Sequence, residues 1–290
     1  MTAGRDKAGF AGAVEIRRVD VDGQRLRVGV RHGDAGTTPL LIFNGVGANL
    51  ELVEPFISAM PGVEVVIFDI PGVGGSPTPL LPYRFSSLAR LADKLVSRLG
   101  YSGQVDVLGV SWGGALAQQF AHQFPQRCRR LVLAATSAGA IMVPGRLSVM
   151  LRLVNPRRYR DPAYLDAIGG ELYGGGYRRD PRLLRDHGRG IRPPRGRGYA
   201  YQLMAGWGWS SLWWLRSLRQ PTLVMHGTDD PIIPLVNARI LSRLIRRSRL
   251  HLVDDGHLFL VSSAREVAPV VRRFLADAGD ELADAGSGRP

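Results

Sequence analysis

A serine between glycines carries the strongest chemical signal in this sequence. Residues 109–114 read Gly-Val-Ser-Trp-Gly-Gly, after an apolar run at 105–108 and before a stretch of good helix formers at 115–124. A strand that turns directly into a helix strains the backbone of its hinge residue and exposes that side chain at the edge of the sheet. Gly109 and Gly113 are expected to be small because the turn brings backbones too close for a Cβ atom. This context predicts that Ser111 is a nucleophile.

An acid and a histidine follow in two later segments. The apolar run 222–226 leads into a turn that carries Asp229 and Asp230, and the run 249–253 leads into a loop that ends at His257. Asp230 is favoured as the acid because the spacing Gly-x-x-Asp-x-x-x-Pro at 227–234 matches the usual acid turn better; Asp229 is the alternative. The order serine, acid, histidine along the chain resembles that of the α/β-hydrolases.

These three residue types divide the chemistry of acyl transfer among them. A serine hydroxyl is a weak nucleophile at neutral pH, so His257 is expected to take its proton and later to give it to the leaving alcohol. Asp230 is expected to hold the imidazole tautomer and to stabilise the imidazolium. Asp254 and Asp255 precede His257 too closely to be favoured as the acid, and we expect them to form a turn that caps backbone amides.

An oxyanion hole is predicted from a glycine-rich loop after the apolar run 40–43. In this type of site one N–H follows the nucleophile and another comes from such an earlier loop, which nominates the backbone N–H groups of Trp112 and Val46. Asn44 begins the loop and is a candidate substrate contact through its side chain. The alternative is that residues 44–47 form only a tight turn.

Hydrophobic patterning predicts the elements that must position these residues. Apolar runs and helical periodicity alternate along the chain, which is typical of an α/β fold with a mostly parallel eight-stranded sheet and helices on both faces. The expected strands are 14–19, 25–30, 40–43, 63–68, 105–109, 130–134, 222–226 and 249–253, and the expected helices are 85–99, 112–124, 237–245 and 264–276.

The alternation breaks between residues 137 and 215. This interval falls between the strand after the nucleophile helix and the strand before the acid, so it predicts an inserted, mainly helical cap over the site. The expected organisation is a hydrolase core at 1–136 and 216–278, a cap at 137–215 and a flexible tail at 279–290. Trp207, Trp209 and Met142 of the cap are candidate contacts for an apolar substrate. For the cap aromatics as a group, the first expectation is that they form the small core of the cap, and lining a groove for the substrate is the alternative.

Composition narrows the class of protein. Lys and Arg number 38 against 25 acidic residues, a net charge of +13, but only Lys7 and Lys94 are lysines and no nucleic-acid-binding motif accompanies the charge. Nucleic acid is therefore not an expected partner. Eight arginines cluster between Arg178 and Arg197, which leaves attraction to an anionic surface open. No apolar run is long enough to span a membrane, no signal core follows Met1, and the single Cys128 permits no internal disulfide, so we expect a cytoplasmic protein.

Several segments together resemble one family. They are 44–51 (Asn-Gly-Val-Gly-Ala-Asn-Leu-Glu), 69–76 (Asp-Ile-Pro-Gly-Val-Gly-Gly-Ser), the serine turn with 115–125, 133–136 (Leu-Ala-Ala-Thr), 172–181 (Leu-Tyr-Gly-Gly-Gly-Tyr-Arg-Arg-Asp-Pro) and 254–260 (Asp-Asp-Gly-His-Leu-Phe-Leu). This set resembles the intracellular poly(3-hydroxyalkanoate) depolymerases that act on medium-chain-length polyester. The resemblance covers all but the two ends and includes the cap, where general α/β-hydrolases diverge.

The resemblance implies a serine ester hydrolase that degrades stored polyester to 3-hydroxy acids or oligomers through an acyl-enzyme. It implies polyester at the surface of storage granules as the partner, granule-coat proteins as further candidates, and no metal or organic cofactor. Two alternatives stay open. One is a soluble esterase, lactonase or carbon–carbon hydrolase of small molecules, and the other is a non-catalytic granule-binding protein on the same fold.

Overall fold

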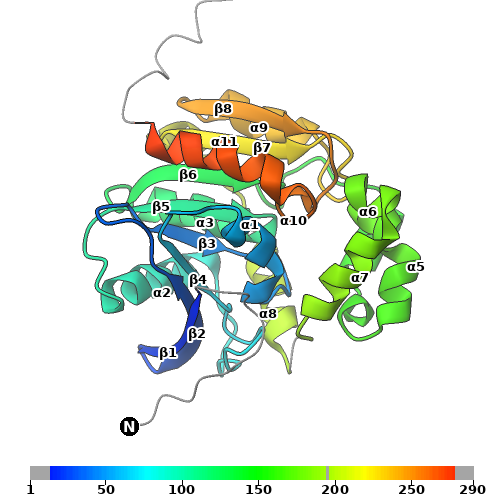
Figure 1. Cartoon of the computed structure of the whole chain (residues 1–290), viewed down its shortest axis with the longest axis horizontal. Coiled ribbons are helices and arrows are strands. Elements are labelled where there is room, and N and C mark those ends of the chain that lie inside the picture. Colours follow the sequence, from blue (N-terminus) through cyan, green and yellow to red (C-terminus); the bar gives the residue numbers. More distant parts are fainter. Residues whose placement is uncertain (1–13, 194–195, 278–290) are drawn as a thin grey trace, which may run out of the picture.

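The computed structural model describes residues 14–193 and 196–277. The predicted tail at 279–290 and Arg195 of the arginine cluster lie outside the described residues. Figure 1 shows one continuous sheet with helices against both faces and a further group of helices beyond one end of it.

Eight strands form the sheet in the order β1-β2-β4-β3-β5-β6-β7-β8. Pairing is antiparallel at β1–β2 and β2–β4 and parallel from β4 onward. The predicted mostly parallel, eight-stranded sheet is thereby confirmed. The strands are β1 (Glu15–Val21), β2 (Gln24–Arg31), β3 (Leu40–Phe43), β4 (Val65–Phe68), β5 (Val105–Val110), β6 (Cys128–Ala134), β7 (Thr222–Gly227) and β8 (Ser248–Val253).

Helices cover both faces of the central part of the sheet, and successive strand residues point to opposite faces. In β3, Leu41 and Phe43 join one apolar cluster, which contains residues of α2 (Phe85–Arg98), α3 (Trp112–Gln123) and α9 (Val236–Leu244). Leu40 and Ile42 join the other cluster, with α1 (Glu54–Ser58), α10 (Phe259–Ser262) and α11 (Ala264–Ala276). Strand β3, whose four residues are all apolar, is therefore buried on both faces.

The structure differs from the predicted elements at the start of β4 and in several short helices that were not predicted. Strand β4 begins at Val65 and not at residue 63. Gly62 lies in the left-handed region at φ 77°, and the N–H of Val63 bonds back to the carbonyl of Met60 at 3.3 Å, so a turn occupies these positions. The sequence also gave no sign of the short helices α1 and α10 or of the 3-10 turn η1 (Leu50–Val53).

The range 137–215, here called the cap segment, is mainly helical in its described residues. Its helices are α4 (Leu147–Val154), η2 (Pro156–Tyr159), α5 (Pro162–Tyr173), α6 (Gly175–Arg179), α7 (Pro181–Gly190) and α8 (Gly198–Gly206), and the 3-10 turn η3 (Leu215–Ser217) begins at its last residue. Local chemistry sets the bounds of α5: the Asp161 carboxylate accepts the N–H of Tyr164 at 3.0 Å, Pro162 opens the first turn, and Gly174 ends the helix at φ 69°. In Figure 1, α5, α6 and α7 stand together beyond the end of the sheet.

The core of the cap segment is not built from its tryptophans. Aliphatic side chains and tyrosines fill it, including Leu165, Leu172, Tyr173 and Tyr177. Trp209 and Trp214 instead pack against the cluster on the sheet. The predicted role of these aromatics as the core of the cap is therefore wrong for the tryptophans, since the main sheet offers them a larger apolar surface.

Candidate active site

The turn between β5 and α3 holds Ser111 in a strained conformation. Ser111 has φ 54° and ψ −119°, a region that residues with a Cβ atom rarely adopt. A Cβ atom on Gly109 would lie 2.3 Å from the carbonyl oxygen of Gly113, and one on Gly113 would lie 2.2 Å from that of Phe43. The glycines thus allow the close approach that places the serine at the carboxyl end of the strand.

The structure brings Ser111, His257 and Asp230 into one hydrogen-bonded chain. Ser111 Oγ lies 3.0 Å from Nε2 of His257, and Nδ1 of His257 lies 2.7 Å from Oδ2 of Asp230. A carboxylate can only accept, so Nδ1 donates and Nε2 is left to accept from the serine hydroxyl. His257 and Asp230 are buried, at 4% and 8% exposure. The arrangement is chemically able to remove the proton of Ser111.

The second oxygen of Asp230 is held by the backbone. Oδ1 accepts the N–H groups of Ile232 and Ile233, both at 2.9 Å. Asp229, the alternative acid, points elsewhere: its carboxylate accepts the N–H of Gly175 at 2.8 Å and pairs with Arg178. The geometry therefore favours Asp230 over Asp229 as the partner of the histidine.

Buried polar groups support the loop that carries His257. The N–H of His257 donates to the carbonyl oxygen of Tyr173 in the cap segment at 2.7 Å. Asp255 accepts the N–H groups of Gly176 and Gly256, at 2.5 and 2.7 Å, and two serine hydroxyls. Burial by itself would raise the pKa of Asp255, but these hydrogen bonds outweigh it and lower the pKa. Asp255 thus joins the histidine loop to α6, in keeping with the expected capping turn.

The loop after β3 lies beside the serine. A Cβ atom on Gly45 would be 3.8 Å from that of Ser111, and Val46 lines the same cavity as Ser111. Asn44 lines this cavity too, while its side chain bonds within the loop, donating to the carbonyl of Asn49 at 2.9 Å and accepting the N–H of Gly45 at 3.0 Å. The N–H of Trp112 opens α3, where the first helical N–H groups have no partner within the helix.

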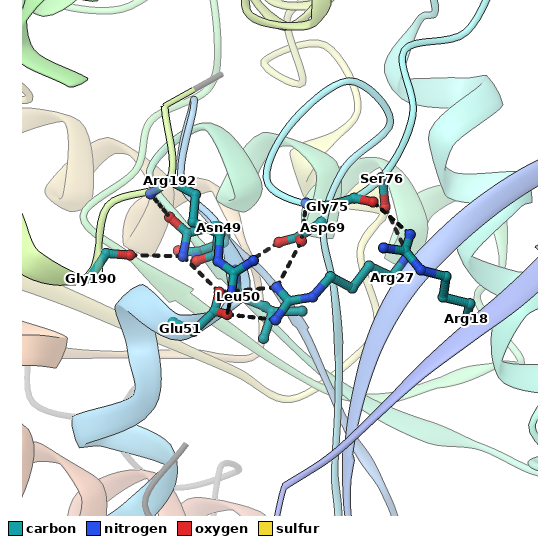
Figure 2. A network of polar contacts seen from close by, with 11 residues as sticks. Arg18, Arg27, Asn49, Leu50, Glu51, Asp69, Gly75, Ser76, Gly190 and Arg192 are labelled. Atoms are coloured by element: carbon teal, nitrogen blue, oxygen red, sulfur yellow. Dashed lines mark hydrogen bonds and ion pairs between the residues drawn. The ribbon is translucent and has the colours of Figure 1, made fainter. Parts of the chain in front are cut away.

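A buried ion cluster anchors this loop to the sheet (Figure 2). Arg27 of β2, 1% exposed, donates to Glu51 at 2.6 Å and to Asp69 at 3.1 Å. Asp69 in turn accepts the backbone N–H groups of Leu50 and Gly75, at 2.8 and 2.7 Å. One arginine therefore ties together the loops that follow β3 and β4, both at the end of the sheet where Ser111 lies.

The same cluster reaches the cap segment. Asn49 donates to the carbonyl of Gly190 and accepts the N–H of Arg192, both at 2.9 Å, and the Arg192 guanidinium pairs with Glu51 at 2.9 Å (Figure 2). Burial would raise the pKa of Glu51, but hydrogen bonds from Arg27 and Asn49 overcome it and lower the pKa. Glu51 thus remains an anion between two arginines and links core to cap segment.

Most arginines of the 178–197 cluster have acidic neighbours. Ion pairs join Arg178 to Asp229, Arg182 to Asp180 and Arg189 to Asp186. Together with Arg192 on Glu51, these pairs neutralise much of a charge that looks uncompensated in the linear sequence. They explain part of the cluster without any external anion.

Gln202 of α8 connects both sides of the predicted oxyanion hole. Its side-chain oxygen accepts the N–H of Gly47 at 2.7 Å, and its backbone carbonyl accepts the indole N–H of Trp112 at 2.8 Å. Gln202 is fully buried. Nothing in the sequence singled it out, because a lone glutamine in a helix gives no local signal.

The cavity at Ser111 and His257 is small and has an unusual lining. Its volume is about 60 Å³, and besides the serine and the histidine it is lined by Arg158, Tyr159 and His187 of the cap segment. None of these three was predicted, since neither spacing nor periodicity marks them. Tyr159 donates its hydroxyl to the carbonyl of Val46, so the cap segment directly contacts the oxyanion loop.

Three predicted substrate contacts do not line this cavity. Trp207 is 89% exposed on the surface. Trp209 donates its indole N–H to Gln119 at 2.9 Å and packs on Phe85, and Met142 lies against the apolar cluster of the cap segment. Their sequence neighbourhood could not show this, because side-chain direction in an irregular segment depends on its tertiary contacts.

His226, next to the acid turn, is a fully buried neighbour of Asp230. Its Nε2 lies 2.7 Å from the carbonyl oxygen of Ile233 and 3.5 Å from Oδ2 of Asp230. Burial lowers the pKa of His226, so the imidazole stays neutral. Within residues 14–193 and 196–277 no group of three or more His, Cys, Asp or Glu side chains could hold a metal ion, and no helix is long and apolar enough to cross a membrane.

A family model for the alpha/beta hydrolase fold matches residues 38–264, which contain the serine turn, the acid turn and the histidine loop. The chain belongs to the α/β-hydrolase family. This hydrolase is 55% identical over 261 residues to the poly(3-hydroxyalkanoate) depolymerase of Ectopseudomonas oleovorans, a match that covers 90% of this chain and 92% of the relative. The predicted resemblance is confirmed by that identity.

More distant proteins share the fold of this hydrolase. The 2-hydroxy-6-oxo-2,4-heptadienoate hydrolase of Pseudomonas putida is 29% identical, over 84% of this chain and 91% of the relative. The crystal structure of the enol-lactonase from Burkholderia xenovorans LB400 superimposes with a TM-score of 0.77 at 22% identity, covering 90% of this chain and all of that one. At that identity the likeness concerns the fold alone.

Proposed function

We propose that this hydrolase is a serine esterase that degrades medium-chain-length poly(3-hydroxyalkanoate) to 3-hydroxy acids or oligomers. The observation that carries the proposal is the hydrogen-bonded chain from Ser111 through His257 to Asp230 in a protein 55% identical to a poly(3-hydroxyalkanoate) depolymerase. The polyester would be bound at the surface of storage granules inside the cell.

The reaction follows from the positions of the side chains. Ser111 attacks an ester carbonyl while His257 takes its proton, and the oxyanion is stabilised by the N–H groups of Val46 and Trp112. The ester C–O bond then breaks, and His257 returns the proton to the leaving hydroxyl. Water activated by His257 hydrolyses the acyl-serine and releases the acid. Asp230 keeps the proton of the neutral histidine on Nδ1 and stabilises the imidazolium.

Residues 137–215 would act as a cap that admits the substrate. The cavity of about 60 Å³ is far below the roughly 300–1,000 Å³ of ordinary ligand pockets. A polyester segment can therefore reach Ser111 only if side chains or helices of the cap segment move. Tyr159 and Leu153 are among the residues of this segment that line the cavity.

Exposed apolar side chains would hold the enzyme on the polymer. Trp207, Trp213 and Leu80 are 89%, 79% and 97% exposed, and the backbone of Leu80 lies next to α8 through a hydrogen bond from Tyr201. Large exposed apolar groups favour adsorption to an apolar surface. We assign Trp207 to this contact and not to the cavity. Granule-coat proteins are further candidate partners, and a pull-down from coated granules tests whether they bind the enzyme.

The test is clearing of an amorphous medium-chain polyester suspension by the purified protein. p-Nitrophenyl octanoate serves as a soluble comparison and Ser111→Ala as the inactive control. Clearing with release of 3-hydroxy acids, lost in Ser111→Ala, supports the proposal. Cleavage of the soluble ester without clearing would instead identify a small-molecule esterase, lactonase or carbon–carbon hydrolase, and granule binding without either activity would identify a non-catalytic binding protein.

A further inference from the structure

A buried arginine in the cavity of Ser111 has no acidic partner among the described residues. Arg158 is 4% exposed and lines the cavity together with Ser111 and His257. The ion pairs found within the described residues include none for its guanidinium. A buried cation without a counter-charge is strongly unfavourable, so its presence beside a nucleophile requires a reason.

Neutral groups satisfy only part of this guanidinium. Nε donates to the carbonyl of Leu153 at 3.0 Å, Nη1 donates to the Tyr173 hydroxyl at 3.1 Å, and the group stacks 4.0 Å from the ring centre of Tyr159. Nη2 is buried and has no hydrogen-bond partner among the residues described. The side chain is thus fixed in place with one charged donor unused.

A second buried polar atom lies in the same wall. His187 of α7 is 9% exposed, lines the cavity, and its Nδ1 likewise has no partner within the described part of the chain. Burial and the charge of Arg158 lower the pKa of His187 to about 4, so Arg158 supplies the only full charge of the two near neutral pH. An anion that reached this wall would meet a guanidinium donor and an imidazole together.

From these contacts we propose that Arg158 binds a carboxylate of the substrate and thereby directs cleavage to the carboxyl end of the chain. The inference rests on the proposed function. Internal units of a polyester are neutral, and only the terminal unit carries a carboxylate. A short carbon chain separates this carboxylate from the oxygen of the last ester bond. Arg158 and Ser111 line the same cavity, so a chain end admitted by movement of the cap segment would bring its terminal carboxylate and its last ester into one site.

The hydrolysis then proceeds on the last ester. Ser111 Oγ bonds to the carbonyl carbon of the penultimate unit, the ester C–O bond breaks, and the alkoxide of the terminal unit takes the proton from His257. The product is a free 3-hydroxy acid, which then dissociates from Arg158. Water hydrolyses the acyl-serine, which leaves a new carboxylate at the shortened end for the next cycle.

The kinetic test compares two dimers of 3-hydroxyoctanoic acid, one with a free carboxyl end and one with that end as the neutral primary amide. The wild type is expected to prefer the acid by about 10- to 100-fold in kcat/KM, the range for one charge-assisted hydrogen bond to a buried group. Arg158→Met should abolish the preference mainly through a higher KM for the acid. Arg157→Met is the matched control, because its neighbouring guanidinium is exposed and pairs with Asp161.

Equal kcat/KM for acid and amide in the wild type would overturn the proposal, and so would a preference that survives in Arg158→Met. Arg158→Met loses two hydrogen bonds, and this loss could unfold the cap segment. A second readout therefore keeps Arg158 and measures ligand binding to Ser111→Ala by calorimetry. That protein should bind 3-hydroxyoctanoate at least tenfold more tightly than 3-hydroxyoctanamide. If the wild type cleaves neither dimer, the proposed function fails, while equal binding of the two ligands would refute the carboxylate site on its own.

Discussion

Replacing Asp230 by asparagine tests the site through the orientation of one amide. In the native protein, Oδ1 accepts two backbone N–H groups, from Ile232 and Ile233, each at 2.9 Å. An NH₂ group in that position would face two donors, so the amide of Asp230→Asn must keep its oxygen there. Its NH₂ group then faces Nδ1 of His257, which lies 2.7 Å from the present Oδ2.

This forced orientation reverses the histidine tautomer. Nδ1 must accept, so Nε2 carries the proton and cannot take another from Ser111. The same wrong tautomer costs a serine protease roughly 10⁴-fold in kcat, a figure established for that enzyme and about 5 kcal/mol of transition-state stabilisation. We expect a loss of the same order for p-nitrophenyl octanoate hydrolysis, with KM changed little.

Asp229→Asn is the matched control. Asp229 is 43% exposed at its side chain, and its ion pair with Arg178 is partly in solvent, so the change should alter kcat less than about threefold. The reasoning would be refuted if Asp230→Asn, folded by circular dichroism, stayed within tenfold of the wild type, or if Asp229→Asn were the damaging change.

Further predictions follow from other parts of the structure. Gly113→Ala should lower the free energy of unfolding by about 2–4 kcal/mol in urea titrations, because its Cβ atom would meet the carbonyl oxygen of Phe43 at 2.2 Å, whereas Gly103→Ala, with nothing within 4 Å, should change it by less than about 1 kcal/mol. Gln202→Leu should lower kcat on p-nitrophenyl octanoate about tenfold with little change in KM, since it frees the N–H of Gly47 beside the oxyanion loop; an unchanged kcat would show that this bond does not position the loop. His187 has its pKa lowered from 6.5 to about 4 on folding, so the unfolded chain binds more protons and stability should fall as pH drops from about 6.5 to 4, by at most about 3 kcal/mol. Urea titrations at several pH values should show a weaker pH dependence in His187→Gln, and an identical one would contradict the assignment.

Local patterns predicted the sheet and its covering helices well. The run of four apolar residues in β3 predicts, from the sequence alone, a strand that is buried on both faces. In the structure its alternate residues face the two apolar clusters. Gly109 and Gly113 likewise predict the close approach of the backbone around Ser111. The bounds of β4 and the short helix α10 escaped prediction, because turn hydrogen bonds and single-turn helices leave little periodicity.

The cap segment shows where sequence reasoning stopped. Its tryptophans suggested an aromatic core or groove, yet Trp209 packs on the sheet and Trp207 faces solvent. Arg192 looked like part of an exposed basic cluster, yet it pairs with the buried Glu51. Such partners lie more than a hundred residues apart, and no local spacing records them.

The sequence by itself predicted the eight strands, the helices α2, α3, α9 and α11, the turn at Ser111 and the candidates Asp230 and His257. Each of these depends on residue types within a few positions of one another. Only the tertiary structure decided that Oδ1 of Asp230 is held by backbone amides, that Gln202 joins the two sides of the oxyanion loop, and that Arg158 shares the cavity of the serine. These facts arise where the cap segment packs on the core. Packing of that kind depends on shape and burial between distant segments, which a linear pattern does not encode.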